Sequence, residues 1–267
     1  MDRRYLARIN ALPLLAAAVA AGLALAGCGG GTTAGSGSST TGSGGSASQP
    51  TAGSGAASAA SSGTGTISTP AIFPLAVGNT WVYQEKLTGM HGTVTERVAS
   101  VTPGAGGEQV IMKSRNDLSG IPHTATSSTF VVHPDGSISV PLTQVGSTAI
   151  TVQSGSIVWP GAAQLASGQA YPSTLVVSIN EGGHALTEKA HIVVRGGGTQ
   201  TVHVPAGTYQ ATVVNETISM NVMGIAIGLD VRTWLAPGVG PVQSEVVEKS
   251  AFGAGPQVRE ELKSFTK

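Results

Sequence analysis

The sequence predicts an all-β fold, in which a single antiparallel meander forms a curved sheet, an open barrel or a sandwich with little helix. Runs of β-branched and aromatic residues recur at hairpin spacing over residues 70–267, and clusters of Gly, Pro, Asn and Asp separate them. Almost no long segment repeats its apolar residues with the 3.6-residue period of a helix. The region is long enough to bury one sizeable core, so we expect one β domain at residues 70–267.

The first predicted strand follows the turn signal Gly78-Asn79 and places Trp81, Tyr83 and Glu85 on one face. Residues 155–172, which Pro and Gly interrupt, are predicted to form a loop or a short helix. Before and after that stretch, strands are predicted at residues 93–101, 109–115, 128–133, 137–140, 148–153, 174–179 and 185–194.

Glycine-rich runs divide the remaining part of the domain. Gly196-Gly197-Gly198 is predicted to turn the chain between two strands, and Gly253-Ala254-Gly255-Pro256 is predicted to be the last hairpin turn. The residues after that turn also fit a helical stripe, but the turn favours a final strand. The strands expected here are 199–204, 209–222, 229–235, 242–247 and 258–265.

The N-terminus has the pattern of an export signal. Arg3, Arg4 and Arg8 precede an apolar run at residues 11–26, which ends in Leu25-Ala26-Gly27-Cys28. The run is shorter than the about 20 residues of a membrane-spanning helix, so we expect an anchored chain rather than a spanning one. The opening basic residues also partly resemble a twin-arginine signal, which leaves both the general and the twin-arginine export routes open.

The four residues that end at Cys28 resemble the lipobox of bacterial lipoproteins. That resemblance implies a signal peptide at residues 1–27, cleavage before Cys28, and acylation of the cysteine by fatty acids such as palmitate. It implies a location in the bacterial cell envelope, anchored to a membrane through Cys28. In a cell with two membranes the expected site is the outer membrane or the cell surface.

Residues 28–69 are predicted to be a lipidated cysteine followed by a flexible tether. From Gly29 to Thr69 nearly every residue is Gly, Ser, Thr or Ala, so this segment has too little apolar surface to offset the entropy of ordering it. A Gly-rich coil of this length has a root-mean-square span of roughly 35 Å. Two interpretations stay open, a spacer that crosses wall or surface polymer and a low-complexity segment of unselected length.

Charge and motif content exclude several classes of function. Without residues 1–27 the chain is nearly neutral and concentrates no Lys or Arg, so nucleic acid is not expected as a partner. Cys28 is the single cysteine, which after lipidation leaves no disulfide and no cysteine nucleophile. The folded region has no Gly-x-Ser-x-Gly, HExxH or P-loop pattern. We therefore expect no cofactor and no enzyme activity.

Two histidines are weak candidates for metal ligands. His191 and His203 are equally distant from Gly197, so a hairpin at Gly197 would place them opposite each other. A third ligand, such as Glu188 or Glu216, would have to come from elsewhere in the fold. The alternative is a solvent-facing cross-strand pair, and the sequence gives no firm metal site.

The stretch from Met220 to Leu229 is unusually apolar and breaks strand alternation. One interpretation is a buried strand pair with a glycine turn. The other is a mobile apolar lip at the mouth of a cavity, because Met is adaptable and Gly could act as a hinge. The residues of that possible lip are Met220, Met223, Ile225 and Ile227.

Two motifs carry a resemblance to a group of uncharacterised bacterial exported lipoproteins. They are Pro-Leu-x-x-Gly-x-x-Trp-x-Tyr at residues 74–83 and Trp-x-Ala-x-Gly-Val-Gly-x-Val at residues 234–242. The motifs are structural and bring no catalytic residue, and we expect Trp81 and Trp234 in the core.

The resemblance and the absence of catalytic motifs together point to an envelope lipoprotein that is a non-catalytic binding or structural module. Its expected partners are the membrane and either an envelope protein or an apolar ligand. The alternatives are a carrier of a lipid or apolar small molecule in a β cavity, and an enzyme without a recognisable motif.

Overall fold

The computed structural model describes residues 73–87, 90–119, 124–140, 150–181, 184–222, 225–250 and 253–267. These residues form one 13-stranded antiparallel sheet that is not closed, together with one short helix, α3 (Ala162–Ala166). The predicted all-β class, with a curved antiparallel sheet and little helix, is confirmed. Within the described ranges, no helix has the length and hydropathy needed to span a bilayer.

The strands follow one another mostly as hairpins. They are β1 (Thr80–Leu87), β2 (Met90–Gly104), β3 (Gly107–Leu118), β4 (Thr124–Val132), β5 (Ile138–Val140), β6 (Ile150–Ser154), β7 (Ile157–Trp159), β8 (Ala170–Glu181), β9 (His184–Val204), β10 (Gly207–Val222), β11 (Ile225–Ala236), β12 (Gly240–Ser250) and β13 (Gly253–Thr266). Their order across the sheet is β6-β8-β9-β10-β11-β12-β13-β1-β2-β3-β4-β5-β7.

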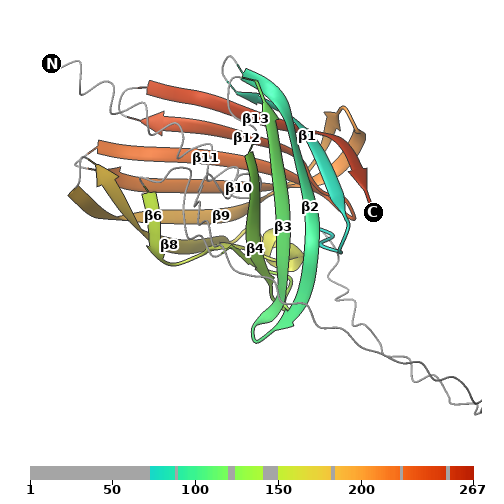
Figure 1. Cartoon of the computed structure of the whole chain (residues 1–267), viewed down its shortest axis with the longest axis horizontal. Helices are drawn as coiled ribbons and strands as arrows, with labels where there is room; N and C mark the ends of the chain where they lie inside the picture. Colours follow the sequence, from blue (N-terminus) through green and yellow to red (C-terminus); the bar gives the residue numbers. More distant parts are fainter. Residues whose placement is uncertain are drawn as a thin grey trace, which may run out of the picture. The chain divides into compact units, whose positions relative to one another are not determined.

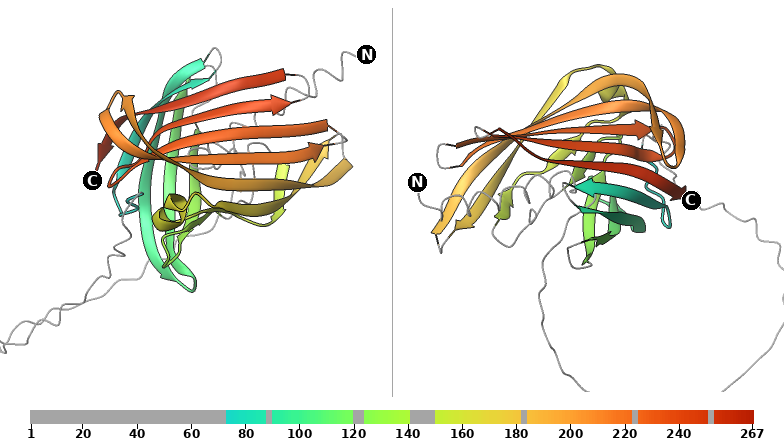
Figure 2. Two further views of the ribbon diagram at one scale, coloured as in Figure 1. Left: turned by 180° about the vertical axis from the view of Figure 1, so that it is seen from behind. Right: turned by 90° about the horizontal axis from the view of Figure 1, so that it is seen from above.

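The sheet bends so that its two halves face each other. In Figure 1, β2–β4 run steeply across the view whereas β9–β12 run nearly horizontally. The right-hand view of Figure 2 shows the strands of the second half as an arched layer beside β1–β4. The first and last strands in sequence, β1 and β13, are hydrogen-bonded neighbours, and their ladder joins the two halves. We call this ladder the seam.

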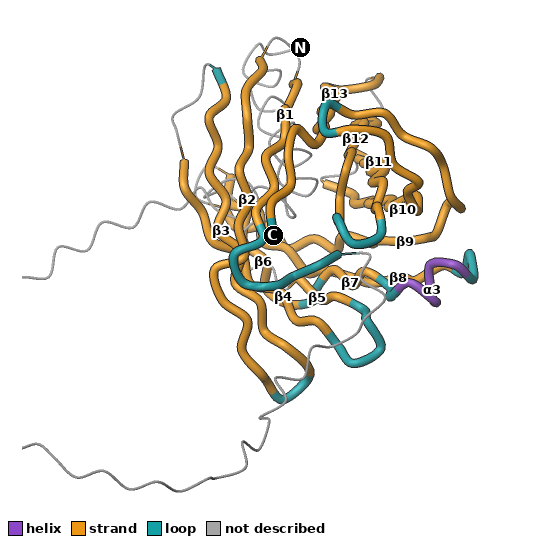
Figure 3. The backbone as a smooth tube through the Cα atoms, turned by 90° about the vertical axis from the view of Figure 1, so that its right-hand side faces the viewer, coloured by secondary structure: helices purple, strands orange, loops and turns teal. Residues whose placement is uncertain are grey.

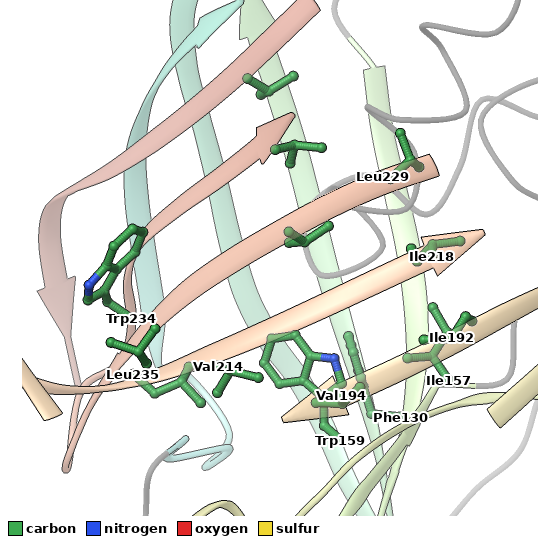
Figure 4. Packing of buried hydrophobic residues seen from close by; sticks show 14 of the residues in the cluster. Phe130, Ile157, Trp159, Ile192, Val194, Val214, Ile218, Leu229, Trp234 and Leu235 are labelled. Carbon is green, nitrogen blue, oxygen red and sulfur yellow. The ribbon is translucent and has the colours of Figure 1, made fainter. Parts of the chain in front are cut away.

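The core lies between the two halves because apolar residues alternate along the strands. In β3, for example, every second residue from Val110 to Leu118 is buried, and the residues that alternate with them are more exposed. Figure 4 shows Phe130 and Trp159, from one half, gathered with residues of the other half in a single buried cluster.

The triple-glycine run does not turn the chain. Strand β9 continues through residues 196–198 and pairs with β10 on both sides of a register shift, so the predicted hairpin is wrong. The run instead permits close packing, because a Cβ on Gly196 would collide with the carbonyl group of Leu165 in α3. A Cβ on Gly197 would lie 2.5 Å from Nδ2 of Asn215. Figure 3 shows α3 close to this region, beside β8.

Residues 155–172 and the C-terminal residues both contain regular secondary structure. Residues 155–172 contain the short strand β7 and helix α3, as one of the two predictions had it. The residues after 256 belong to strand β13, so the final strand is confirmed. The predicted turn at 253–256 is wrong, because Gly253 already pairs with Ser250. Glycine permits turns, but it also adopts extended backbone within a strand.

The two sequence motifs meet in space. The indole Nε1 of Trp81 donates a hydrogen bond to the carbonyl of Val239 at 2.6 Å, and the hydroxyl of Tyr83 donates to the carbonyl of Pro241 at 3.2 Å. Between those carbonyls, Gly240 has a φ of 95°, and a Cβ there would lie 2.6 Å from the ring of Phe73. The motifs therefore fix the first strand against the turn between β11 and β12.

Both motif tryptophans are buried, as predicted, with 0% of Trp81 and 6% of Trp234 exposed. Nε1 of Trp234 donates to the side-chain oxygen of Gln200 at 3.0 Å, and the guanidinium carbon of Arg232 lies 5.8 Å from the ring centroid. The neighbours of Trp234 thus satisfy its one donor and cover its ring.

Candidate functional site

Four glutamates lie buried inside the sheet. The exposed fractions are 1% for Glu85, 2% for Glu96, 4% for Glu216 and 9% for Glu260. Carboxylates are almost never buried this far unless a partner compensates their charge. The interior around these side chains is therefore the candidate functional site.

Strand alternation and register bring three of the four together at the seam. Glu85 follows Trp81 and Tyr83 on the inward face of β1, and Glu260 of β13 stands directly opposite Glu85. Glu96, on β2, stands opposite Trp81. We call Glu85, Glu96 and Glu260 the seam glutamates. Residues directly opposite on neighbouring strands have Cβ atoms about 4.5–5.5 Å apart, so an ionised pair there is unfavourable.

The hydrogen bonds of the seam glutamates are incomplete. Oε2 of Glu85 and Oε1 of Glu96 are buried and have no hydrogen-bond partner in the part of the chain that the structure describes. The residues opposite Glu96 and Glu260 on the outer neighbouring strands are Ser114 and Ser244. An ionised carboxylate without donors costs far more to bury than a neutral carboxyl.

Basic side chains of the same strands point away from the interior. Lys86, next to Glu85, bonds to Glu261 at 3.4 Å, and Arg259, next to Glu260, bonds to Glu245 at 3.2 Å and to Glu261 at 2.7 Å. The Lys and Arg residues described on β1, β2, β3 and β13 are all exposed, namely Lys86, Arg97, Lys113, Arg115, Arg259 and Lys263. The described inward faces of these strands thus carry acidic but no basic side chains, whereas the outward faces carry both and pair them.

The surroundings favour the protonated forms of the interior acids. Burial raises the pKa of Glu85 to about 7. Burial, and then the charge of Glu85, raise the pKa of Glu260 to about 8. Burial, and then the charge of Glu260, raise the pKa of Glu96 well above its usual range. Burial and the charges of Glu96 and Glu260 also raise the pKa of the Tyr83 hydroxyl.

Glu216 forms a separate contact between the two halves of the sheet. Its Oε2 accepts a hydrogen bond from Nε1 of Trp159 at 3.2 Å, while its Oε1 has no partner within the described residues. Trp159 belongs to β7 and Glu216 to β10, so this bond crosses the interior that Figure 4 shows. Burial raises the pKa of Glu216 to about 7, against the lowering effect of the Trp159 bond.

The histidine pair predicted as a weak metal site is not formed. His191 and His203 lie on the same strand, β9, and twelve residues of extended chain separate them by roughly 40 Å. Nδ1 of His191 is 3.4 Å from Oγ1 of Thr174, and Nδ1 of His203 is 2.9 Å from Oγ1 of Thr208. The prediction failed because it required a turn at Gly197. Across the described ranges, no three His, Cys, Asp or Glu side chains converge as metal ligands.

The possible apolar lip lies on the hairpin of β10 and β11. Its strands pair regularly from Met220 opposite Ile227 to Val222 opposite Ile225, and the side chain of Met220 is 8% exposed. The strand pairing of the first interpretation is confirmed, while its glycine turn lies outside the described residues. Met223 and the side chains of Ile225 and Ile227 lie outside the described residues, as does Cys28. Their roles stay predictions.

A small apolar cavity lies near α3, away from the seam glutamates. It measures about 40 Å³, and its walls include Phe73, Trp159, Leu165 and Leu235. Pockets for drug-sized ligands measure about 300–1,000 Å³. This cavity therefore has room for a water molecule or a methyl group and is far too small for a lipid chain.

Sequence reasoning missed the buried glutamates, although the sequence contains a signal for them. Each lies two residues from an apolar residue on both sides, as in Val94-x-Glu96-x-Val98 and Val258-x-Glu260-x-Leu262. Within a strand that spacing places the carboxyl on the same face as its apolar neighbours. This spacing predicts a glutamate on the buried face of a strand. It was missed because the known catalytic motifs have other spacings.

Comparisons with known proteins support the fold. Residues 130–252, fewer than half of the chain, match the family described as DUF3108-like. A candidate lipoprotein from Parabacteroides distasonis has a similar solved structure, with a TM-score of 0.53, 16% identity, and coverage of 73% of this chain and 98% of that chain. No curated protein matches the chain.

Two further solved structures show weaker similarity. One is a candidate exported protein with a YmcC-like fold from Bacteroides fragilis, with a TM-score of 0.49 and 17% identity over 72% of this chain and 97% of that one. The other is the hypothetical lipoprotein YmcC from Escherichia coli, with a TM-score of 0.35 and 9% identity over 76% of this chain and 91% of that one.

Proposed function

We propose that this chain is a lipid-anchored protein of the bacterial cell envelope, and that its β domain is a non-catalytic binding or structural module. The observation that carries the proposal is the sequence Leu25-Ala26-Gly27-Cys28 at the end of an apolar run with a basic start. The similar fold of the candidate lipoprotein from Parabacteroides distasonis supports it. Acyl chains on Cys28 would supply roughly 0.8 kcal/mol of membrane affinity per buried methylene.

The anchor is tested by changing Cys28 to Ala in cells fed with a fatty acid that carries an alkyne label. The wild-type protein should take up the label and stay with the membranes through a high-salt wash. The Cys28→Ala protein should lose the label and leave the membrane fraction. Ser39→Ala, a matched change in the tether, should behave as wild type. A Cys28→Ala protein that resists high-salt extraction would show that the anchor is assigned wrongly.

The finer location is tested on the same cells. Separation of inner and outer membranes on a density gradient, with protease added to intact cells, distinguishes the periplasmic face from the cell surface. In a cell with two membranes we expect the protein in the outer membrane fraction. Recovery in the inner membrane fraction would refute the outer-membrane assignment while leaving the lipid anchor intact.

The non-catalytic role is supported by the way the interior is filled. The acids with raised pKa values lie among buried side chains such as Trp81, Val94 and Leu262. A titratable cluster serves catalysis when a pocket gives substrate access to it.

The alternative function, a carrier of a lipid or apolar small molecule, can be distinguished from the binding module by its bound ligand. A lipid or apolar small molecule needs a cavity several times larger than the about 40 Å³ found near α3. Native mass spectrometry of the Cys28→Ala protein should show the mass of the polypeptide alone and no uptake of an apolar dye. A co-purified apolar molecule would replace the binding-module proposal with the carrier.

A further inference from the structure

The seam glutamates occupy the joint on which the shape of the sheet depends. Strands β8–β13 are linked by successive hairpins, and so are β1–β5, but no hairpin links β13 to β1, which pair through a hydrogen-bonded ladder. That ladder pairs Thr80 to Leu87 with Val258 to Thr266, and Glu85 stands opposite Glu260 within it. Whatever charge Glu85 and Glu260 carry acts directly on the contact between the two halves.

Among the residues whose burial is described, no basic group faces this charge from the inside. The inward-facing titratable groups around the seam are Tyr83 on β1, Glu96 on β2, Glu260 on β13 and, farther along the interior, Glu216 on β10. From β12, β11 and β3 the inward polar residues are Ser244, Thr233, Ser114 and Asn116, which carry no charge. In the described strands Lys86, Arg97, Arg259 and Lys263 face outward.

We propose that Glu85, Glu96 and Glu260 form a proton-dependent lock: protons on these carboxyls keep the seam between β13 and β1 closed, and loss of the protons loosens it. A protonated carboxyl is neutral and can donate a hydrogen bond to a neighbouring carboxyl oxygen. Protonation therefore removes the repulsion and supplies a donor for the unpartnered oxygens of Glu85 and Glu96 at the same time.

The direction of the pH dependence follows from the environment of these groups. Burial raises the pKa of Glu85 to about 7 and, together with Glu85, that of Glu260 to about 8, from a usual value of 4.5. Between 4.5 and those values the closed seam binds more protons than an open, solvated one. The closed state is therefore favoured at acidic pH and weakens as pH rises through 7 and 8, and each proton released changes the opening equilibrium about tenfold per pH unit.

Hydrogen exchange of the full-length protein, purified in a mild detergent, measures this opening strand by strand. The exchange rates are compared between about pH 6 and about pH 9, after correction for the intrinsic effect of pH on free amides. We expect peptides of β1 and β13 to lose protection at least about tenfold more than peptides of β3 and β4. Equal protection of β1 and β13 at both pH values would overturn the proposal.

Variants separate the lock from general alkaline instability. Glu260→Gln carries a permanently neutral side chain of the same shape, so the seam should keep more of its protection at high pH. The slope of seam protection against pH should fall by about one power of ten per pH unit. Glu261→Gln changes the next residue on β13, which faces outward, and should keep the wild-type slope. A Glu260→Gln protein with the wild-type slope contradicts the proposal.

Two further measurements distinguish a bound proton from a bound metal ion, and both use the wild-type protein, so they do not depend on a variant that folds. Infrared spectra of the wild-type protein at neutral pH should contain the carbonyl band of protonated carboxyl groups, and this band should disappear at high pH. Protection of the seam should not change when calcium ions or a chelator are added. A shift on adding either would show that a metal ion occupies the site, and the proton lock would be refuted.

Discussion

Replacing Trp81 by Ala should remove the side chain that joins the first strand to both ends of the domain. The ring is fully buried, stacks on Phe265 with centroids 5.1 Å apart, and meets Phe73 edge to face at 5.3 Å. Its N–H donates to the carbonyl of Val239, 158 residues away in sequence. The substitution leaves a cavity bounded by two aromatic rings and an unpaired carbonyl.

The expected loss of stability is large. Truncation of a buried Trp to Ala typically costs about 3–5 kcal/mol, and an unmade hydrogen bond adds roughly 1 kcal/mol. A domain commonly has a total stability of about 5–15 kcal/mol. With a urea dependence of about 3 kcal/mol per molar, at the upper end for small proteins, the midpoint of unfolding should fall by about 1–2 M.

Urea unfolding of the Cys28→Ala protein, followed by far-ultraviolet circular dichroism, is the appropriate assay because it does not depend on indole fluorescence. Trp81→Phe is the matched control, since it keeps a ring against Phe265 and loses the N–H donor. Its midpoint should lie between those of the wild type and Trp81→Ala. A Trp81→Ala protein that unfolds at the wild-type midpoint would show that the ring does not belong to the core.

Three other changes probe the interior and the contact between α3 and β9. Trp234→Ala should also lower the urea midpoint, by about 1 M or more, because the ring is 6% exposed and bonded to Gln200; an unchanged midpoint would place it at the surface. Glu216→Gln should remove part of the pH dependence of stability. Because the pKa of Glu216 lies at about 7, this group makes the wild type lose up to about 3 kcal/mol of stability as pH rises from about 4.5 to 7. The variant should lack that loss. Urea midpoints at both ends of that range measure the difference, and parallel pH profiles would contradict it. Gly196→Ala should destabilise the contact between α3 and β9, because the added Cβ collides with the Leu165 carbonyl. Gly198→Ala is the control: Gly198 has a φ of 79° and open space around it, so this change should report only backbone strain. Equal thermal unfolding midpoints of the two variants would refute the close packing at Gly196.

The strands were predictable because their signal is local. Alternation around Trp81 and Tyr83 determines which face of β1 is buried. The final strand was expected because of a turn at residues 253–256, and the strand is present although that turn is not. The halves of the sheet were not predictable, since the pairing of β1 with β13 depends on contacts across the length of the domain. A one-dimensional pattern contains no information on which strand becomes a neighbour across such a distance.

The two wrongly predicted turns have one physical origin: glycine adopts both the positive φ of turns and the extended backbone of strands. Gly196 and Gly253 were interpreted as turn residues because glycine tolerates positive φ, but both lie within strands. The histidine site failed with the first of these turns. Conversely, Glu96 and Glu260 sit in apolar surroundings that local spacing does reveal, but only once those segments are accepted as strands with one buried face.

The adjacency of β1 and β13 also affects how the domain forms. A ribosome makes β1 long before β13, so the first strand must wait for the last before the ladder on that edge can form. Lys86 and Glu261, which bond across this ladder, are 175 residues apart. Contacts this remote in sequence slow folding, and in the meantime β1 has an unpaired edge that can pair with another chain. Any delay between the synthesis of the chain and its folding would prolong this interval, and with it the exposure of the free edge of β1.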